Sequence, residues 1–70
     1  MVKVDARGLS CPEPVLRLKE KIDINEKEIE LLINCGAAEE NAKRMAFSHG
    51  YELISKEENG ETLILRFAKR

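Results

Sequence analysis

The fold is decided by residues 28–50, which read EIELLINCGAAEENAKRMAFSHG. Ile29, Leu31 and Ile33 share one face of an alternating pattern, which predicts a β-strand over residues 28–33. Residues 34–36 are predicted to form a turn, and residues 37–49 then place apolar side chains at helical spacing. A strand that leads through a short turn into a helix is typical of an α/β fold.

The predicted helix at 37–49 has recognisable ends. Glu39 and Glu40 lie in its first turn, where carboxylates favour the positive end of the helix dipole, and Gly50 is a stop signal. Its expected apolar stripe consists of Ala38, Ala42, Met45, Ala46 and His49.

Working outward, the remaining elements follow from the same patterns. Towards the N-terminus we predict a strand at 2–5, a turn at 7–10 and a helix at 12–21 whose buried face holds Val15, Leu18 and Ile22. A polar loop follows at 23–27. Beyond Gly50 we predict strands at 51–57 and 61–68, joined by a two-residue hairpin turn at Asn59-Gly60. Leu63, Leu65 and Phe67 should lie on one face of the last strand.

The element order predicts a two-layer α/β sandwich. Its order is β-α-β-α-β-β, in a mixed four-stranded sheet with both helices on one face, because two right-handed crossovers place them together if the sheet grows in one direction. With 70 residues the chain is expected to be a single domain, 1–70. Alternation places Leu32 and Ile64 on the face without helices, either as singly exposed apolar residues, which we favour, or as part of a partner surface.

The composition excludes several classes of function. A formal net charge of -1 argues against general nucleic-acid binding, which needs a basic excess. No apolar run is long enough to span a membrane, so we expect a soluble, cytoplasmic protein. With 2 Cys and 1 His, a four-ligand metal site within the chain is not expected, although zinc shared across a dimer stays open.

Cys11 is the leading candidate for chemistry. It stands directly before Pro12, at the predicted start of the helix at 12–21, where unpaired N–H groups and the helix dipole favour a thiolate. Arg7 could add positive charge, and Pro12 and Pro14 stiffen the first turn. The alternative is that Cys11 is a small buried apolar residue.

The stretch from Val4 to Val15, VDARGLSCPEPV, resembles the N-terminal signature of the TusA/YedF/SirA family of sulfur carriers. The similarity rests on the Cys-Pro-x-Pro motif, on the Asp-x-x-Gly-x-x-Cys spacing of Asp5, Gly8 and Cys11, and on the matching element order over all 70 residues. The resemblance implies that Cys11 carries a persulfide. It also implies no organic cofactor, and docking to a sulfur donor of the cysteine desulfurase or rhodanese type and to a sulfur-acceptor protein.

The second cysteine departs from the family pattern. Family members often have Asp, commonly followed by Pro, where this chain has Cys35-Gly36. If the strands at 2–5 and 28–33 are parallel neighbours, Cys11 and Cys35 lie along one sheet edge, where they could form a disulfide or Cys35 could attack a persulfide. The simpler interpretation, which we favour, is that Cys35 is a small residue in a turn.

Other residues have simpler roles. Glu13 could aid proton transfer but is better explained as complementing the helix dipole, and His49 is better explained as structural or capping than as catalytic. Arg17 and Lys21 could help an acidic partner to dock. The alternatives to a sulfur carrier are a thiol redox switch that uses Cys11 and Cys35, and a regulatory binding module with a structural Cys11. The resemblance also leaves open a link to selenium metabolism.

Overall fold

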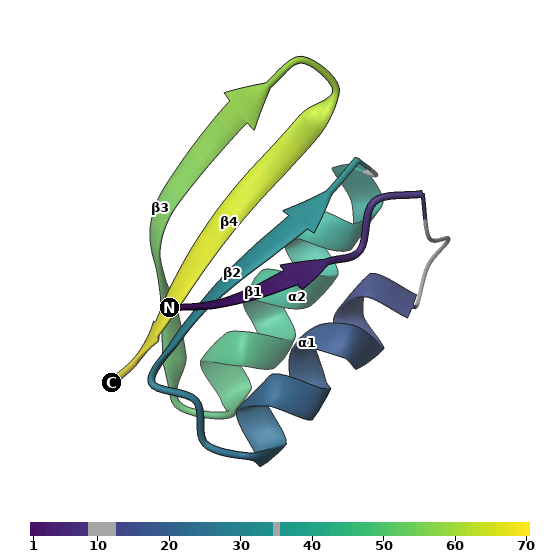
Figure 1. Cartoon of the computed structure of the whole chain (residues 1–70). Coiled ribbons are helices and arrows are strands. Elements are labelled where there is room, and N and C mark those ends of the chain that lie inside the picture. The colour runs from purple at the N-terminus through teal and green to yellow at the C-terminus, as the bar shows by residue number, and fades with distance from the viewer. Residues whose placement is uncertain (9–12, 35) are drawn as a thin grey trace.

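The computed structural model describes residues 1–8, 13–34 and 36–70. Within them the order is β-α-β-α-β-β, as predicted (Figure 1). The elements are β1 (Val2–Asp5), α1 (Glu13–Asp23), β2 (Glu28–Ile33), α2 (Gly36–Ser48), β3 (Tyr51–Asn59) and β4 (Thr62–Lys69). Helix α1 runs past the predicted end at residue 21 because Ile22 is buried in the core and continues the apolar face.

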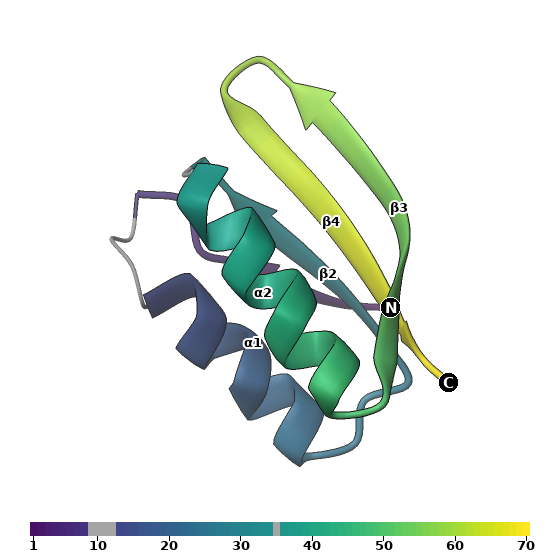
Figure 2. The ribbon, with the colours of Figure 1, turned by 180° about the vertical axis from the view of Figure 1, so that it is seen from behind.

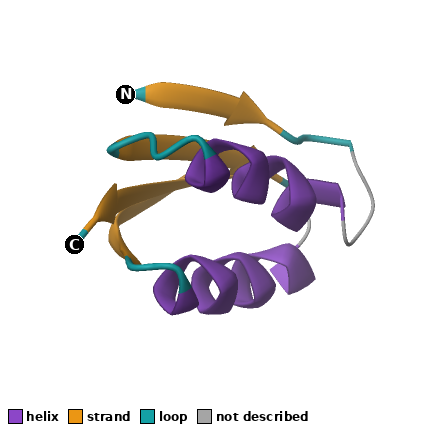
Figure 3. Cartoon of the chain, turned by 90° about the horizontal axis from the view of Figure 1, so that it is seen from below, coloured by secondary structure: helices purple, strands orange, loops and turns teal. Residues whose placement is uncertain are grey.

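The sheet is mixed, with the strand order β1-β2-β4-β3. β1 and β2 are parallel, and β4 is antiparallel to both β2 and β3. The last strand is therefore inserted between β2 and β3. Both helices lie on the same face of this sheet, as Figures 2 and 3 show, and the predicted two-layer α/β sandwich is confirmed.

The core lies between the helices and the inner face of the sheet. Every predicted inward residue of β2 is fully buried, as are Leu65 and Phe67 of β4. Facing them, α2 presents Ala38, Ala42 and Ala46, all at 0% exposure, so the small side chains let this helix approach the sheet closely. Each large side chain buried here contributes about 1.5–3 kcal/mol through the hydrophobic effect.

The β3–β4 hairpin turns one residue later than the sequence predicts. Asn59 pairs with Thr62, so the two turn residues are Gly60 and Glu61, not Asn59 and Gly60. Gly60 has a φ of 65°, and a glycine at the first turn position is the pattern of a type II′ turn. Asn59 therefore belongs to the paired part of β3, and Gly60 is the turn residue that adopts the left-handed conformation.

The outer face of the sheet differs from the prediction at Leu32. Leu32 pairs with Ile64 on β4 and with Asp5 on β1, and it is only 6% exposed. The prediction that Leu32 is singly exposed is wrong, because it lies on a central strand with neighbours on both sides. On this face Arg66 also donates from Nε to Glu30 (2.9 Å) and from Nη1 to Glu57 (3.2 Å), which ties the three strands β2, β4 and β3 together.

Candidate functional site

The candidate site lies at the edge of the sheet where β1 and β2 end. The two strands are hydrogen-bonded parallel neighbours, with Asp5 opposite Leu32. The N–H of Ala6 continues the pairing by donating to the carbonyl oxygen of Leu32 over 2.9 Å. The segments that follow β1 and β2 therefore leave the sheet side by side. In α/β sheets the carboxyl ends of parallel strands are the usual location of functional sites.

The three residues on which the thiol prediction depends, Cys11, Pro12 and Cys35, lie outside the described residues. The reactive thiol and the possible second thiol therefore stay predictions. The described residues around them are Arg7 and Gly8 after β1, Glu13 and Pro14 at the beginning of α1, and Asn34 and Gly36 on the two sides of residue 35.

A side chain from the segment that follows β2 holds the segment that follows β1. The backbone N–H of Gly8 donates to Oδ1 of Asn34 over 3.0 Å, across 26 positions of sequence. Gly8 has a φ of 80°, a conformation that glycine adopts without strain. The predictions assigned Asn34 to a turn but not to this contact. The available signal was its residue type, since an Asn side chain at a turn often accepts a backbone N–H.

The charge of Arg7 is directed to Asp5. The Arg7 guanidinium donates from Nε to Oδ1 (2.9 Å) and from Nη2 to Oδ2 (2.8 Å) of Asp5, and the Arg7 backbone N–H donates to Oδ1 over 3.2 Å. These hydrogen bonds lower the pKa of Asp5 to about 2. Arg7 was predicted to add positive charge near Cys11. Because Asp5 neutralises that charge at contact distance, the more direct role of the pair is to hold the turn after β1.

The first turn of α1 is anchored on one side and exposed on the other. The Pro14 side chain is fully buried, so it anchors the first turn of α1 in the protein interior. Glu13 is exposed, and its Oε2 lies 3.8 Å from Nε of Arg17, one turn further along α1. A carboxylate in this turn complements the helix dipole, as predicted for Glu13, and its pairing with Arg17 is loose enough for solvent to screen it.

The first turn of α2 is tied to the edge strand β3 by a contact that the sequence did not predict. Oε2 of Glu39 lies 2.9 Å from Nζ of Lys56, and the Glu39 side chain is only 14% exposed. The hydrogen bond from Lys56 lowers the pKa of Glu39, and the nearby charge of Lys43 adds to the effect. The beginning of the helix that follows residue 35 is therefore fixed to the far strand of the sheet.

His49 caps the other end of α2. The prediction that it belongs to the buried stripe is wrong: the side chain is exposed, because Ala46 completes the buried face. Its Nδ1 lies 2.8 Å from the carbonyl oxygen of Met45, one of the acceptors left open at a helix end. His49 thus has the capping contact expected of it, at the end of α2 away from residue 35.

Two general findings bear on the type of site. Among residues 1–8, 13–34 and 36–70, no group of three or more His, Cys, Asp or Glu side chains is arranged to hold a metal ion. No helix in the described part of the chain is long and apolar enough to cross a bilayer.

Comparison with known proteins agrees with the fold and the motif. Residues 2–69 match the family model described as sulfurtransferase TusA. A protein of Methanocaldococcus jannaschii is 40% identical over 60 residues (83% of this chain and 80% of that protein), and one of Archaeoglobus fulgidus is 38% identical over 69 residues (96% and 88%). Both are named as candidate sulfur carrier proteins.

A solved structure gives the same result for the architecture. The crystal structure of a SirA-like protein from Desulfitobacterium hafniense superimposes with a TM-score of 0.83 at 25% identity, and the match covers 97% of this chain and 96% of that one. From the family match over nearly the whole length and the relatives at about 40% identity, the chain belongs to the TusA sulfurtransferase family.

Proposed function

We propose that this protein is a sulfur carrier that bears sulfur as a persulfide on Cys11, between a donor protein and an acceptor. The observation that carries the proposal is the position of the motif in the chain. The Cys-Pro-x-Pro motif at residues 11–14 follows Gly8, which is held at the carboxyl edge of β1 and β2, and its last two residues, Glu13 and Pro14, begin α1. Family membership and the names of the two archaeal relatives support the same role.

The proposed chemistry is two successive thiol–disulfide-type exchanges. The Cys11 thiolate attacks the terminal sulfur of a donor persulfide, so that a new S–S bond forms on Cys11 while the donor S–S bond breaks and the donor thiolate leaves. An acceptor nucleophile then attacks the terminal sulfur on Cys11, and the Cys11 thiolate is the leaving group. Neither step needs an external oxidant or reductant. Both steps need Cys11 as an anion, which the beginning of α1 would favour through its unpaired N–H groups.

The donor is expected to be a cysteine desulfurase or a rhodanese-type protein, and the acceptor a protein of a sulfur-using pathway. A carrier of this kind needs a thiol that stays reduced when unloaded, which suits the cytoplasm. The structure also shows which positive charges near the motif already lie close to carboxylates of this chain. Among the described residues, the cations nearest to the motif in the sequence, Arg7 and Arg17, are both engaged with carboxylates of this chain.

Intact-mass measurement tests the proposal. After incubation with a cysteine desulfurase and cysteine, the wild type should gain the mass of one sulfur atom, and dithiothreitol should remove it. The Cys11→Ser variant should gain nothing, while Cys35→Ser is the matched control and should load like the wild type. Equal loading of Cys11→Ser and wild type, or no loading of either, would refute the proposal.

A thiol redox switch is the second candidate, and one contact favours it. The hydrogen bond between Gly8 and Asn34 joins the segment that leads to Cys11 to the segment that leads to Cys35. A switch predicts that mild oxidant removes both free thiols together and that Cys35→Ser abolishes the response. A carrier predicts that Cys35→Ser still loads sulfur, so the same two variants separate the two functions.

A further inference from the structure

The three backbone amides that follow β1 all donate hydrogen bonds within the protein. The N–H groups of Ala6 and Arg7 have their acceptors on β2 and β1, the strands beside them. The third amide, that of Gly8, donates over 3.0 Å to Oδ1 of Asn34, which belongs to the segment that follows β2. Of these three bonds, the last alone depends on a side chain from a distant part of the sequence. A substitution at Asn34 therefore removes it without changing the segment that it holds.

This hydrogen bond holds one end of the stretch that contains Cys11. Gly8 is three residues before Cys11 in the sequence. On the other side of Cys11, the buried side chain of Pro14 anchors the beginning of α1. The described residues thus support the cysteine by a core contact on one side and by a polar contact on the other, and the polar contact is the one that depends on Asn34.

The bond lies at the surface, which affects its energetic weight. Gly8 and Asn34 are both exposed, so water can replace either partner when the bond breaks, and the net contribution to stability is modest. Its effect on chain conformation is larger. Gly8 has no side chain, so its backbone can adopt more conformations than that of any other residue, and the bond to Asn34 favours the one with a φ of 80°.

Sulfur transfer between proteins depends on where the nucleophile lies. The attacking thiolate has to approach the terminal sulfur of the donor closely, and the docked donor fixes where that sulfur is. A displacement of about 1 Å in a reacting group can cost about a hundredfold in rate. A small reagent can diffuse to a thiol in many positions and does not make this demand. The placement of the segment that holds Cys11 should therefore matter for a protein donor and much less for a small molecule.

The other polar contact of this segment does not have the same reach. The Asp5–Arg7 pair spans two positions and holds the turn after β1 locally. Asn34, in contrast, is 26 positions from Gly8 and lies where the chain leaves β2. It is therefore the described side chain that fixes the segment leading to Cys11 relative to the neighbouring strand.

We propose that Asn34 is a positioning residue for sulfur transfer. By holding the Gly8 amide, its side chain fixes the course of the segment that leads to Cys11, so that the thiolate meets the persulfide of a docked donor protein. Asn34 acts through Gly8, and the S–S bonds that form and break are those of the exchange described above. The inference rests on the proposed function of Cys11 as the sulfur carrier.

Single-turnover transfer kinetics test the proposal. A cysteine desulfurase that already carries a persulfide is mixed with excess carrier at a pH of about 9, where even an ordinary thiol with a pKa of about 8.5 is mostly ionised. The Cys35→Ser chain is the reference and the background for every variant, so that Cys11 is the one thiol of the carrier. Intact mass, followed over time, gives the maximal transfer rate and the carrier concentration at half of it.

Asn34→Ala should lower the maximal transfer rate about tenfold, because the segment with Cys11 is no longer held. The half-saturating concentration should not change, since the rest of the surface is the same. Asn34→Asp keeps an acceptor oxygen for the Gly8 amide and should restore most of the rate. Alkylation of Cys11 by iodoacetamide at the same pH should proceed at the reference rate in both variants, because a small reagent needs no positioning.

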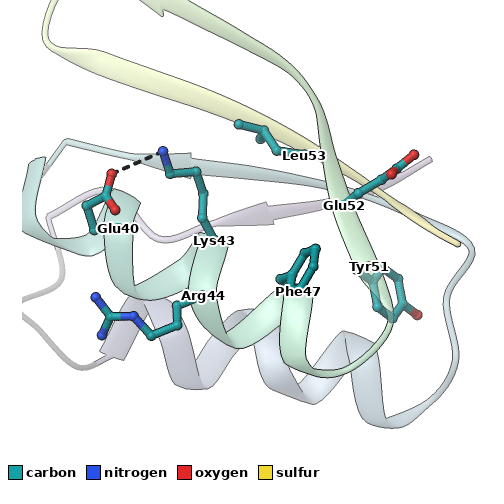
Figure 4. Close-up of a pocket in the computed structure, with 7 residues that line it drawn as sticks. All are labelled: Glu40, Lys43, Arg44, Phe47, Tyr51, Glu52 and Leu53. Carbon is teal, nitrogen blue, oxygen red and sulfur yellow. Dashed lines mark ion pairs between the residues drawn. The ribbon is translucent and has the colours of Figure 1, made fainter.

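The matched control lies in the groove between α2 and β3, which Phe47 and Tyr51 help to line (Figure 4). The groove has a volume of about 380 Å³. The Tyr51 hydroxyl is directed away from Phe47 in Figure 4 and donates to the carbonyl oxygen of Glu26. Tyr51→Phe removes one hydrogen bond between a side chain and the backbone, as Asn34→Ala does, but at the edge of the sheet where β2 begins. It should transfer sulfur at the reference rate.

The outcomes separate this inference from the proposed function. If the reference chain takes up no sulfur, the proposed function is wrong and the positioning role is wrong with it. If the reference chain loads and Asn34→Ala reaches the same maximal rate, the positioning role alone is wrong. It is also overturned if Asn34→Asp is as slow as Asn34→Ala, if alkylation slows as much as transfer, or if Tyr51→Phe slows transfer equally.

Discussion

The backbone amide of Gly8 and the side chain of Asn34 are joined by a 3.0 Å hydrogen bond that links the ends of two parallel strands. Asn34→Ala removes the only acceptor that the described residues offer to this amide, and we expect a loss of about 1 kcal/mol in the free energy of unfolding. Urea denaturation measures it. Asn34→Asp keeps an acceptor oxygen and should lose less, and Asn41→Ala, on the exposed side of α2, should lose nothing. Equal stability of Asn34→Ala and wild type would show that the bond is not needed.

The Asp5–Arg7 pair gives the protein a specific dependence on pH. The pKa of Asp5 is lowered from 3.8 to about 2 in the folded state. A depressed folded pKa means that the pair stabilises the fold above the unfolded pKa, and that this stabilisation is lost as the pH falls from about 4 to about 2. Thermal unfolding over this range should show a steeper fall in Tm for the wild type than for Asp5→Asn. Parallel curves for the two proteins would contradict the prediction.

The Glu39–Lys56 contact should couple α2 to β3 energetically. In a double-mutant cycle with Glu39→Ala and Lys56→Ala, we expect a coupling free energy of about 0.5–1 kcal/mol, since Glu39 is mostly buried but Lys56 is 42% exposed. The fully surface pair Lys19–Asp23, at 3.1 Å within α1, is the control and should couple by about 0.3 kcal/mol. A cycle at Glu39–Lys56 no larger than the control would mean that burial adds nothing to this pair.

The hairpin turn should be most stable with glycine at residue 60. Its φ of 65° strains any residue with a Cβ, although nothing lies within 4 Å of a Cβ built there. We therefore expect Gly60→Ala to lower the free energy of unfolding by about 1 kcal/mol through backbone strain alone. Gly36 begins α2, has equally open surroundings and no positive φ, so Gly36→Ala should be neutral or slightly stabilising. If Gly60→Ala and Gly36→Ala unfold at the same denaturant concentration, the prediction that backbone strain at residue 60 lowers the free energy of unfolding is wrong.

The strands were predictable because each carries a local signature. Alternation gave β1 and β2 with the bounds that the structure has, and it gave the inward face of β4. The strand order was not predictable by the same means, since no local pattern says that β4 lies between β2 and β3. That order is the reason why Leu32, predicted to be exposed, is covered by neighbours on both sides.

For the candidate site, the sequence identified the Cys-Pro-x-Pro motif but not the contacts that hold the neighbouring segments in place. The Asp5–Arg7 pair spans two positions and was within reach of local reasoning, whereas the Gly8–Asn34 bond spans 26 and depends on β1 and β2 being neighbours. The Glu39–Lys56 contact and the groove at Phe47 both require α2 to lie against β3. Contacts between elements follow from tertiary packing, and a single sequence read along its length does not contain them.

The position of β4 also determines when the sheet can assemble during synthesis. Among the strands that the structure describes, β3 pairs only with β4, and β4 joins β3 to the β1–β2 pair. A nascent chain that has emerged only as far as Gly60 can form β1 against β2 under its helices, while β3 has no strand beside it. During synthesis, the complete four-stranded sheet therefore cannot form until residues 62–69 have emerged.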